Sequence, residues 1–222
     1  MRLAGIGHRY RRGPWVLRDL DVDLAFGTVV GVSGANGTGK STLLRIVAGV
    51  QRPGRGHVAG RPHRVAYVPE RLEPPPVRVQ RWSSDLGRVR GTPTGAIAAA
   101  LGTPASPAAP LSSLSKGTVR KVLLAEALAA PATLLVLDEP WADLDADGAA
   151  ALSGALHRRA AEGALVVVAD HTGAGRTVAD TEIGTGGSAP RPVVDVRYRG
   201  DGDRVVELDE AAARLGFRRV GP

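Results

Sequence analysis

Cysteine is absent from the 222 residues of this sequence, so the chain forms no disulfide bond and offers no thiolate to a metal. Long apolar runs are absent too, because none approaches the ~18 residues that a membrane-spanning helix needs. The first residues, Met1 to Gly5, contain no apolar core, and we expect no signal peptide. These absences fit a globular chain in a reducing compartment, with one domain or a domain and a small subdomain.

Basic side chains outnumber acidic ones, 29 to 22, and the formal net charge is +7. Such an excess is typical of proteins that bind nucleic acid or an anionic membrane surface. The arginines are scattered along the sequence, however, and only two of the three tryptophans lie near arginine pairs. We therefore interpret the excess mainly as solvated surface and expect no nucleic-acid partner, with proximity to phospholipid as a lesser alternative.

A glycine-rich segment, residues 34–42, lies between an apolar run at 29–32, which predicts a buried strand, and a helical pattern at 43–48. Strand, glycine loop, Gly-Lys-Ser and helix form a P-loop, whose backbone N–H groups and helix N-terminus bind phosphate. We expect Lys40 to reach the β- and γ-phosphates and the Ser41 hydroxyl to bind Mg²⁺. The alternative, a flexible glycine turn with a solvated lysine, does not explain this order of elements. The residues predicted to bind nucleotide here are Gly34, Asn36, Gly37, Thr38, Gly39, Lys40, Ser41 and Thr42.

Upstream of this loop, residues 15–26 alternate apolar and acidic side chains, which predicts a half-buried strand. Two aromatic residues nearby, Tyr10 and Trp15, are candidates for stacking an adenine ring. We place Tyr10 in this role, with Trp15 as its competitor. The alternative for either residue is a plain aromatic side chain at a strand end.

The middle of the chain is less regular. Residues 54–60 are rich in turn formers, and residues 64–68 predict a short strand. Residues 77–113, which follow three consecutive prolines, mix arginines with small residues, and only Gly95 to Leu101 has a helical pattern. We interpret this region as a small helical subdomain inserted at about residues 74–130.

A capped helix is expected after this region. Ser115 is a candidate N-cap for a helix that runs up to Pro131 with an apolar face. The Ser115 hydroxyl, the Gly117 amide and the helix N-terminus also converge, which makes them a second candidate anion site. An ordinary N-cap is the alternative interpretation.

An apolar run at residues 133–137 ends in two adjacent carboxylates, Asp138 and Glu139. A continuous run predicts a strand that is covered on both faces of a parallel sheet. Adjacent carboxylates at its end are costly unless a cation or a reaction requires them. We therefore expect Asp138 to hold Mg²⁺ and Glu139 to orient and polarise the water that attacks the γ-phosphate. An ordinary acidic pair at the surface is the alternative.

A final strand and a histidine complete the pattern. Residues 143–145 lead into a helix that stops near Gly163, and residues 164–169 predict another buried strand. Because open α/β sheets bind ligands outside the carboxyl ends of their strands, we expect His171 beside the γ-phosphate. The other histidines are not spaced as metal ligands; they are His8, His57, His63 and His157.

Taken in order, these motifs resemble the ATP-binding subunit of ABC transporters over residues 1 to about 184. GANGTGKST is similar to the P-loop of that family, LSKGT to its signature motif, and LLVLDEP to its magnesium and catalytic strand. Residues 142–145 are similar to its D-loop, and His171 to its switch histidine. A P-loop alone fits many NTPases, but this combination fits one family.

The resemblance implies an α/β fold: a P-loop NTPase core with a mainly parallel sheet, an antiparallel β edge and the inserted helical subdomain. It implies ATP and Mg²⁺ as cofactors and Glu139 and His171 as catalytic residues. It also implies a head-to-tail dimer, in which Ser115 and Gly117 of one subunit close over the ATP of the other. The D-loop residues Leu144 and Asp145 would lie at this interface.

Four positions depart from the family pattern. Glu70 stands where a glutamine helps to bind the metal, and we include it among the metal ligands; Thr118 replaces a glutamine. Asp143 replaces a small residue and Glu126 an arginine. These departures are compatible with one half of an asymmetric pair, so a homodimer and a heterodimer both stay open.

We expect residues 1–187 to form the ATP-binding domain and residues 188–222 to form an extension with a hairpin and a short helix. The implied function is the ATPase subunit of a membrane transporter, peripheral on the cytoplasmic face of the membrane and held by transmembrane permease subunits. Because no large domain follows the cassette, we expect an exporter. The alternative is a soluble ABC-type ATPase that acts on ribosomes or nucleic acid, but the sequence has neither a second cassette nor coiled-coil heptads. A P-loop GTPase is disfavoured because the sequence lacks an Asn-Lys-x-Asp motif.

Overall fold

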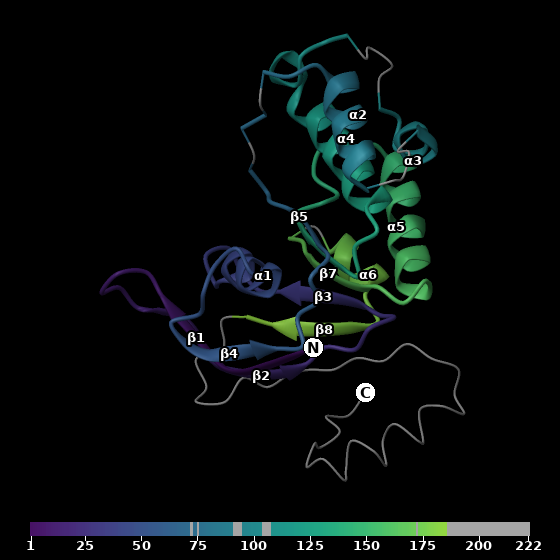
Figure 1. The fold of residues 1–222 in the computed structure, drawn as a ribbon. Helices are drawn as coiled ribbons and strands as arrows, with labels where there is room; N and C mark the ends of the chain where they lie inside the picture. Colours follow the sequence, from purple (N-terminus) through teal and green to yellow (C-terminus); the bar gives the residue numbers. More distant parts are fainter. Residues whose placement is uncertain (72, 75, 91–94, 104–107, 172, 186–222) are drawn as a thin grey trace, which may run out of the picture.

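The computed structural model of the chain describes residues 1–71, 73–74, 76–90, 95–103, 108–171 and 173–185. Figure 1 shows two β-sheets with helix α1 beside them and a lobe of helices above them. The extension predicted at residues 188–222 lies outside the described residues.

The central sheet has five strands in the order β5-β6-β7-β3-β8, and every neighbouring pair is parallel. The strands are β3 (Val29–Ser33), β5 (Val65–Val68), β6 (Leu134–Asp138), β7 (Leu165–Ala169) and β8 (Thr181–Gly184). The four apolar runs predicted as strands are confirmed. Strand β8 follows the histidine in a segment where no clear strand was predicted.

The side chains of each central strand alternate between two apolar cores. Leu135 and Leu137 of β6 face a core formed with helices α4 (Lys116–Ala129) and α5 (Ala146–Ala161). Leu134 and Val136 face a second core, which contains helix α1 and the antiparallel sheet. Because both faces are covered, β6 and β7 are buried along their whole lengths, and this explains their continuous apolar sequences.

Three helices follow central strands: α1 (Lys40–Ala48), α5 (Ala146–Ala161) and α6 (Ala174–Val178). Helix α1 ends at Gly49, whose φ of 84° is left-handed. The Arg61 guanidinium donates to the carbonyls of Ile46 and Val47 in the last turn of the helix, and the Ile46 carbonyl also accepts from the Gly49 amide. The C-terminal end of α1 is thereby fixed against the core.

The antiparallel sheet has the order β2-β1-β4 and consists of β1 (Arg2–Arg9), β2 (Trp15–Asp23) and β4 (Arg55–Ala59). Strand β2 and the antiparallel β edge are confirmed. The turn prediction for residues 54–60 is wrong, and β1 was not predicted. The pairing of β1 with β4 shifts register where Gly5 and Gly56 both have positive φ, and this irregularity removes the simple alternation that reveals a strand.

The helical lobe contains α2 (Val79–Arg90), α3 (Gly95–Ala100), a 3₁₀ turn η1 (Leu111–Ser113) and α4 (Lys116–Ala129). Figure 1 shows these elements together above the central sheet. Helices α3 and α4 are confirmed, but the prediction that only Gly95 to Leu101 is helical in this region is wrong. Helix α2 carries apolar residues at helical spacing (Val79, Trp82 and Leu86), but Gly87 and two serines lower its intrinsic helix propensity. None of the helices described is both long enough and apolar enough to cross a membrane.

We expect Gly56→Ala to destabilise the chain strongly. A Cβ atom at Gly56 would lie 2.2 Å from the Ala4 carbonyl oxygen and 2.3 Å from that of Gly5. Gly60 is a matched control, because its φ of +68° is also left-handed but the nearest atom to an added Cβ, the Met1 Cα, is 3.7 Å away. Urea unfolding should show a loss of about 1–2 kcal/mol for Gly60→Ala and about 3 kcal/mol or more for Gly56→Ala. Equal losses would contradict the bulge at Gly56.

Candidate nucleotide site

The glycine loop joins β3 to α1, and its backbone needs glycine. Gly34, Gly37 and Gly39 have φ values of 146°, 81° and 106°, which side chains with a Cβ rarely adopt. At Gly34 a Cβ would also lie 2.4 Å from the Thr185 hydroxyl oxygen. Thr38 closes the loop, because its hydroxyl donates to the Ala35 carbonyl at 2.8 Å. When left-handed glycines alternate with right-handed residues, successive backbone N–H groups point toward one place, and this is the geometry of an anion-binding site.

Lys40 lies in this loop with only 8% of its surface exposed. Its ammonium group donates to the carbonyl oxygens of Gly34 at 2.8 Å and Ala35 at 3.3 Å. These two acceptors are neutral, and the charged oxygens of an anionic ligand would bind the ammonium group more strongly. Asn36, at the tip of the loop, is exposed.

Asp138, the last residue of β6, is 2% exposed, and its Oδ2 atom has no hydrogen-bond partner among the described residues. Burial raises the pKa of Asp138, and the nearby charges of Glu70 and Glu139 raise it further. A hydrogen bond from Ser41 and the charge of Arg45 oppose this rise in the pKa. A buried carboxylate with a free oxygen and like charges beside it is suited to a cation.

The oxygen donors around Asp138 fit Mg²⁺ in chemical type. The set contains the Asp138 carboxylate, the Ser41 hydroxyl and the Glu70 carboxylate, and Mg²⁺ prefers hard oxygen ligands. The Glu70 side chain is 48% exposed and lies 3.7 Å from the Arg71 guanidinium. Its effect on the pKa of Asp138 nevertheless places its charge close to the site.

Glu139 and His171 meet at the same edge of the sheet. Strands β6 and β7 pair with Asp138 opposite Ala169, so the residues after them are neighbours. Glu139 is 9% exposed, and its Oε2 atom lies 2.5 Å from His171 Nδ1 and 3.3 Å from the His171 backbone nitrogen. The φ of Glu139 is 52°, a left-handed value that turns its side chain toward the histidine.

Asp170 belongs to this cluster, although the sequence analysis gave it no role. Ligand atoms of Glu139, Asp170 and His171 lie within 4.8 Å of one another. Asp170 Oδ2 accepts a hydrogen bond from the Gly175 backbone at 3.0 Å, so one of its oxygens holds the start of α6. The signal that the sequence offered was its position directly before His171 at the end of a buried strand.

Tyr10 lies beside the first turn of α1. Its hydroxyl is hydrogen-bonded to that of Thr42 at 2.9 Å, and 47% of the residue is exposed. Trp15 is placed differently, because its ring lies 5.0 Å from the Arg9 guanidinium and 4.6 Å from that of Arg55. Of the two aromatic candidates, the structure therefore brings Tyr10 next to the P-loop helix. Adenine stacking on Tyr10 stays a prediction.

The signature and D-loop residues form a second cluster, at the N-termini of α4 and α5. Ser115 caps α4 by accepting from the Thr118 amide at 3.2 Å, which agrees with the predicted N-cap. A Cβ at Gly117 would lie 3.2 Å from Asp143, so the two motifs touch.

Asp145 caps α5 by accepting from the Gly148 amide, and it also pairs with Lys121 at 3.1 Å. Both contacts lower the pKa of Asp145, the hydrogen bond from Gly148 more than Lys121. Its neighbour Leu144 packs against the core of α4 and α5. These contacts within one chain leave the interface role of Leu144 and Asp145 a prediction.

Residues 17–142 match the model of the family described as ABC transporter. The zinc import ATP-binding protein ZnuC of Rhizobium meliloti (strain 1021) is 38% identical over 156 residues, which cover 68% of this chain and 51% of ZnuC. The cytochrome c biogenesis ATP-binding export protein CcmA of Cupriavidus necator is 36% identical over 185 residues, covering 76% of this chain and 81% of CcmA. The chain thus spans about half the length of ZnuC and most of CcmA.

A solved structure has the same fold. The dimeric ATP-binding cassette MJ0796, in a post-hydrolysis state bound to ADP and Pi, gives a TM-score of 0.71 over 83% of this chain and 93% of its own. The sequence identity is 20%, so this likeness shows the fold alone.

The buried charge of Asp138 should lower the stability of the folded chain at neutral pH. Its pKa is raised on folding, so the native state binds the proton more tightly and stability falls as the pH rises through the native pKa. Asp138→Asn should therefore increase the free energy of unfolding at pH 7, with no gain below the ordinary carboxyl pKa of about 4. Glu70→Gln removes only one neighbouring charge and should give a smaller gain.

Urea unfolding of the wild type and both variants between pH 4 and pH 8 measures this effect. If Asp138→Asn is no more stable than the wild type at pH 7, the Asp138 carboxylate does not destabilise the folded state.

Proposed function

The chain belongs to the ABC transporter family, and from this membership we propose that it binds and hydrolyses ATP to drive a membrane transporter. One observation carries the proposal. The glycine loop, the buried Asp138 and the pair Glu139 and His171 follow β3, β6 and β7, which are adjacent in one parallel sheet. A phosphate cradle, a cation ligand and a candidate general base are thereby gathered at a single edge.

ATP binding is assigned to the loop and to α1. The loop N–H groups and the positive end of α1 face the phosphates, and Lys40 exchanges its carbonyl partners for phosphate oxygens. Tyr10 stacks on the adenine ring. Ser41, Asp138 and Glu70 would hold Mg²⁺, which would supply positive charge next to the phosphates when bound.

Hydrolysis is assigned to Glu139 and His171. A water oxygen attacks the γ-phosphorus, the bond to the oxygen that bridges the β-phosphate breaks, and Glu139 accepts the proton of the water. His171 contacts both Glu139 and the γ-phosphate and so keeps the carboxylate in position. The support for this role is the 2.5 Å contact between Glu139 Oε2 and His171 Nδ1.

The working form is a head-to-tail dimer, either with a second copy or with a related subunit. Ser115 and Gly117 bind the γ-phosphate held by the opposing subunit, and Leu144 and Asp145 lie at the contact between subunits. The support for this dimer is that the signature motif and the D-loop contact each other at the neighbouring N-termini of α4 and α5. Ser115 then serves as helix cap and phosphate ligand together.

Transmembrane permease subunits are the partners, and they hold the chain at the cytoplasmic face of the membrane. Export is the proposed direction, supported by the match to CcmA, which is named an export protein and is covered over 81% of its length; the ZnuC relatives, which are named import proteins, are covered over 51% to 73% of theirs.

Glu139→Gln tests the catalytic role. The carboxamide keeps the shape but cannot accept a proton, so kcat should fall by about 10²–10⁴ while MgATP binding persists. ATP should then hold the variant as a dimer, which light scattering at saturating MgATP would detect. Adding Ser115→Arg should return the molecule to a monomer, because the larger side chain crowds the opposing phosphate.

The outcomes separate the two assignments. Hydrolysis by Glu139→Gln at the wild-type rate would remove Glu139 from the mechanism. A variant that binds MgATP but stays monomeric would contradict a self-sufficient homodimer and leave the asymmetric pair.

A further inference from the structure

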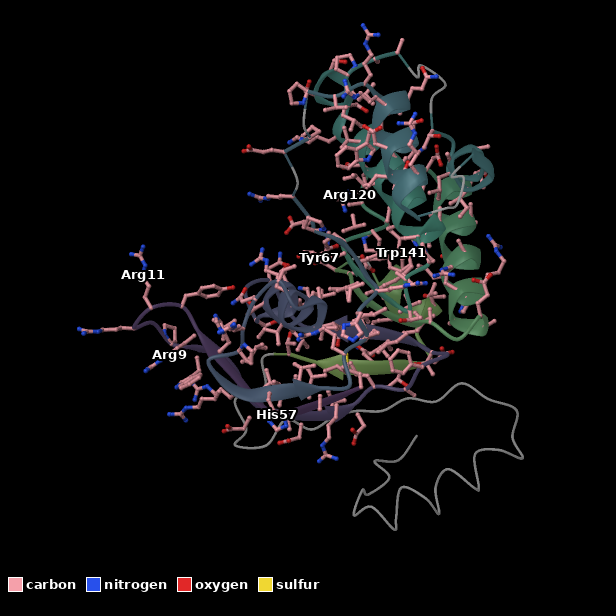
Figure 2. All side chains as sticks on the ribbon, viewed as in Figure 1. Arg9, Arg11, His57, Tyr67, Arg120 and Trp141 are labelled. Atoms are coloured by element: carbon pink, nitrogen blue, oxygen red, sulfur yellow. The ribbon has the colours of Figure 1, made fainter. Side chains whose placement is uncertain are left out.

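Three arginines bind backbone carbonyls in the described part of the chain, and one of them reaches the proposed catalytic edge. Arg61 holds the end of α1, and Arg159 of α5 donates to the carbonyls of Ala130 and Ala132. Arg120, on the signature helix α4, donates instead to the backbone around the carboxylates. Figure 2 shows Arg120 at the base of the helical lobe, above Tyr67 of β5 in this view.

The contacts of Arg120 join two separate loops. Nη1 donates to the carbonyl oxygen of Asp138 at 3.2 Å and to that of Glu139 at 2.6 Å, while Nη2 donates to the carbonyl oxygen of Glu70. One planar guanidinium thus links the end of β6 to the loop after β5. Both segments carry proposed site residues, and α4 begins at the signature motif.

The bond to Glu139 stabilises an unfavourable backbone conformation. A left-handed φ, here 52°, costs about 1–2 kcal/mol for a residue with a side chain. Hydrogen bonds on both sides of this residue hold it there: its N–H donates to the Ala169 carbonyl at 2.8 Å, and its carbonyl accepts from Arg120 and from the Ala142 amide. The conformation in turn directs the carboxylate to His171.

Arg120 acts through the backbone, and the charge balance of the site comes from elsewhere. The cation that lowers the pKa of Asp138 is Arg45, of helix α1. The three hydrogen bonds of Arg120 described above all end on carbonyl oxygens. Its removal should therefore change the placement of the site residues more than their charge.

We propose that Arg120 is a positioning residue that couples the signature helix to the metal-binding and catalytic segments of the same chain. The inference rests on the proposed function. In the dimer, the N-terminus of α4 contacts the ATP of the opposing subunit. Arg120, one turn further along the same helix, fixes Glu70, Asp138 and Glu139 of its own chain. A shift of α4 on closure is then transmitted to the site of its own chain.

Arg120→Lys is the main test, with Arg159→Lys as its matched control. Lysine keeps the charge and most of the stem, but its single ammonium group cannot span the three carbonyls. We expect kcat for ATP hydrolysis to fall about tenfold or more, as the loss of one or two hydrogen bonds to the catalytic backbone implies, with KM changed less than about threefold. Arg159→Lys should lower the melting temperature similarly and leave kcat unchanged.

Binding gives a readout that needs no turnover. In calorimetric titrations, Mg²⁺ should increase the ATP affinity of the wild type and of Arg159→Lys. The gain should be about tenfold smaller in Arg120→Lys, while its affinity for metal-free ATP stays within about twofold of the wild type. Arg120→Gln, whose shorter side chain also cannot span the three carbonyls, should show a reduction in the Mg²⁺ gain at least as large, and this variant replaces Arg120→Lys if the lysine variant does not fold.

The possible failures are distinct. Wild-type protein that binds no ATP would overturn the proposed function and the inference with it. Wild-type protein that binds MgATP, together with an Arg120→Lys variant that keeps both kcat and the full Mg²⁺ gain, would overturn only the inference. An equal loss of affinity with and without Mg²⁺ would also overturn it, because it would indicate general loosening of the fold.

Discussion

Parallel pairing of β3, β6 and β7 is the constraint on which the site depends. In a parallel sheet all carboxyl ends lie along one edge, and the register sets Val32 and Asp138 on either side of Ala169. The segments that leave these strands are the glycine loop, the carboxylate pair and the Asp170-His171 pair. Residues more than a hundred positions apart in the sequence thus become neighbours through the pairing of these strands.

Several unfavourable features of the fold lie at that edge. A buried carboxylate with a raised pKa, a buried lysine and the left-handed backbone of Glu139 all occur there. Two continuous apolar cores, one on each face of the sheet, stabilise the chain enough to keep these groups in place. Ligand binding relieves part of the cost, because phosphate and Mg²⁺ satisfy the groups that the protein leaves poorly paired.

The sequence predicted the elements with strong local patterns. Continuous apolar runs indicated β3, β6 and β7, the predicted cap Ser115 coincides with the start of α4, and residues 143–145 lead into α5 as expected. Strand β4 was missed because it is mostly exposed and bulged at Gly56, so its stability comes from pairing with β1. Residue types that carry chemistry, such as Lys40 and Glu139, were predictable from motifs. The contacts of Arg120 were not, because they depend on how α4 lies over two loops that are distant in sequence.

The central claim is that residues 34–42 bind the phosphates of ATP, and calorimetric titration of the wild type and Lys40→Ala with MgATP tests it most directly. The Lys40 ammonium is the cation that lies on this loop, with its Nζ atom 2.8 Å from the Gly34 carbonyl. Loss of a charge-assisted contact of about 1.5–3 kcal/mol predicts an affinity roughly 10–100-fold lower in the variant, with an unchanged circular dichroism spectrum. Equal affinities, or no binding by the wild type, would contradict the account.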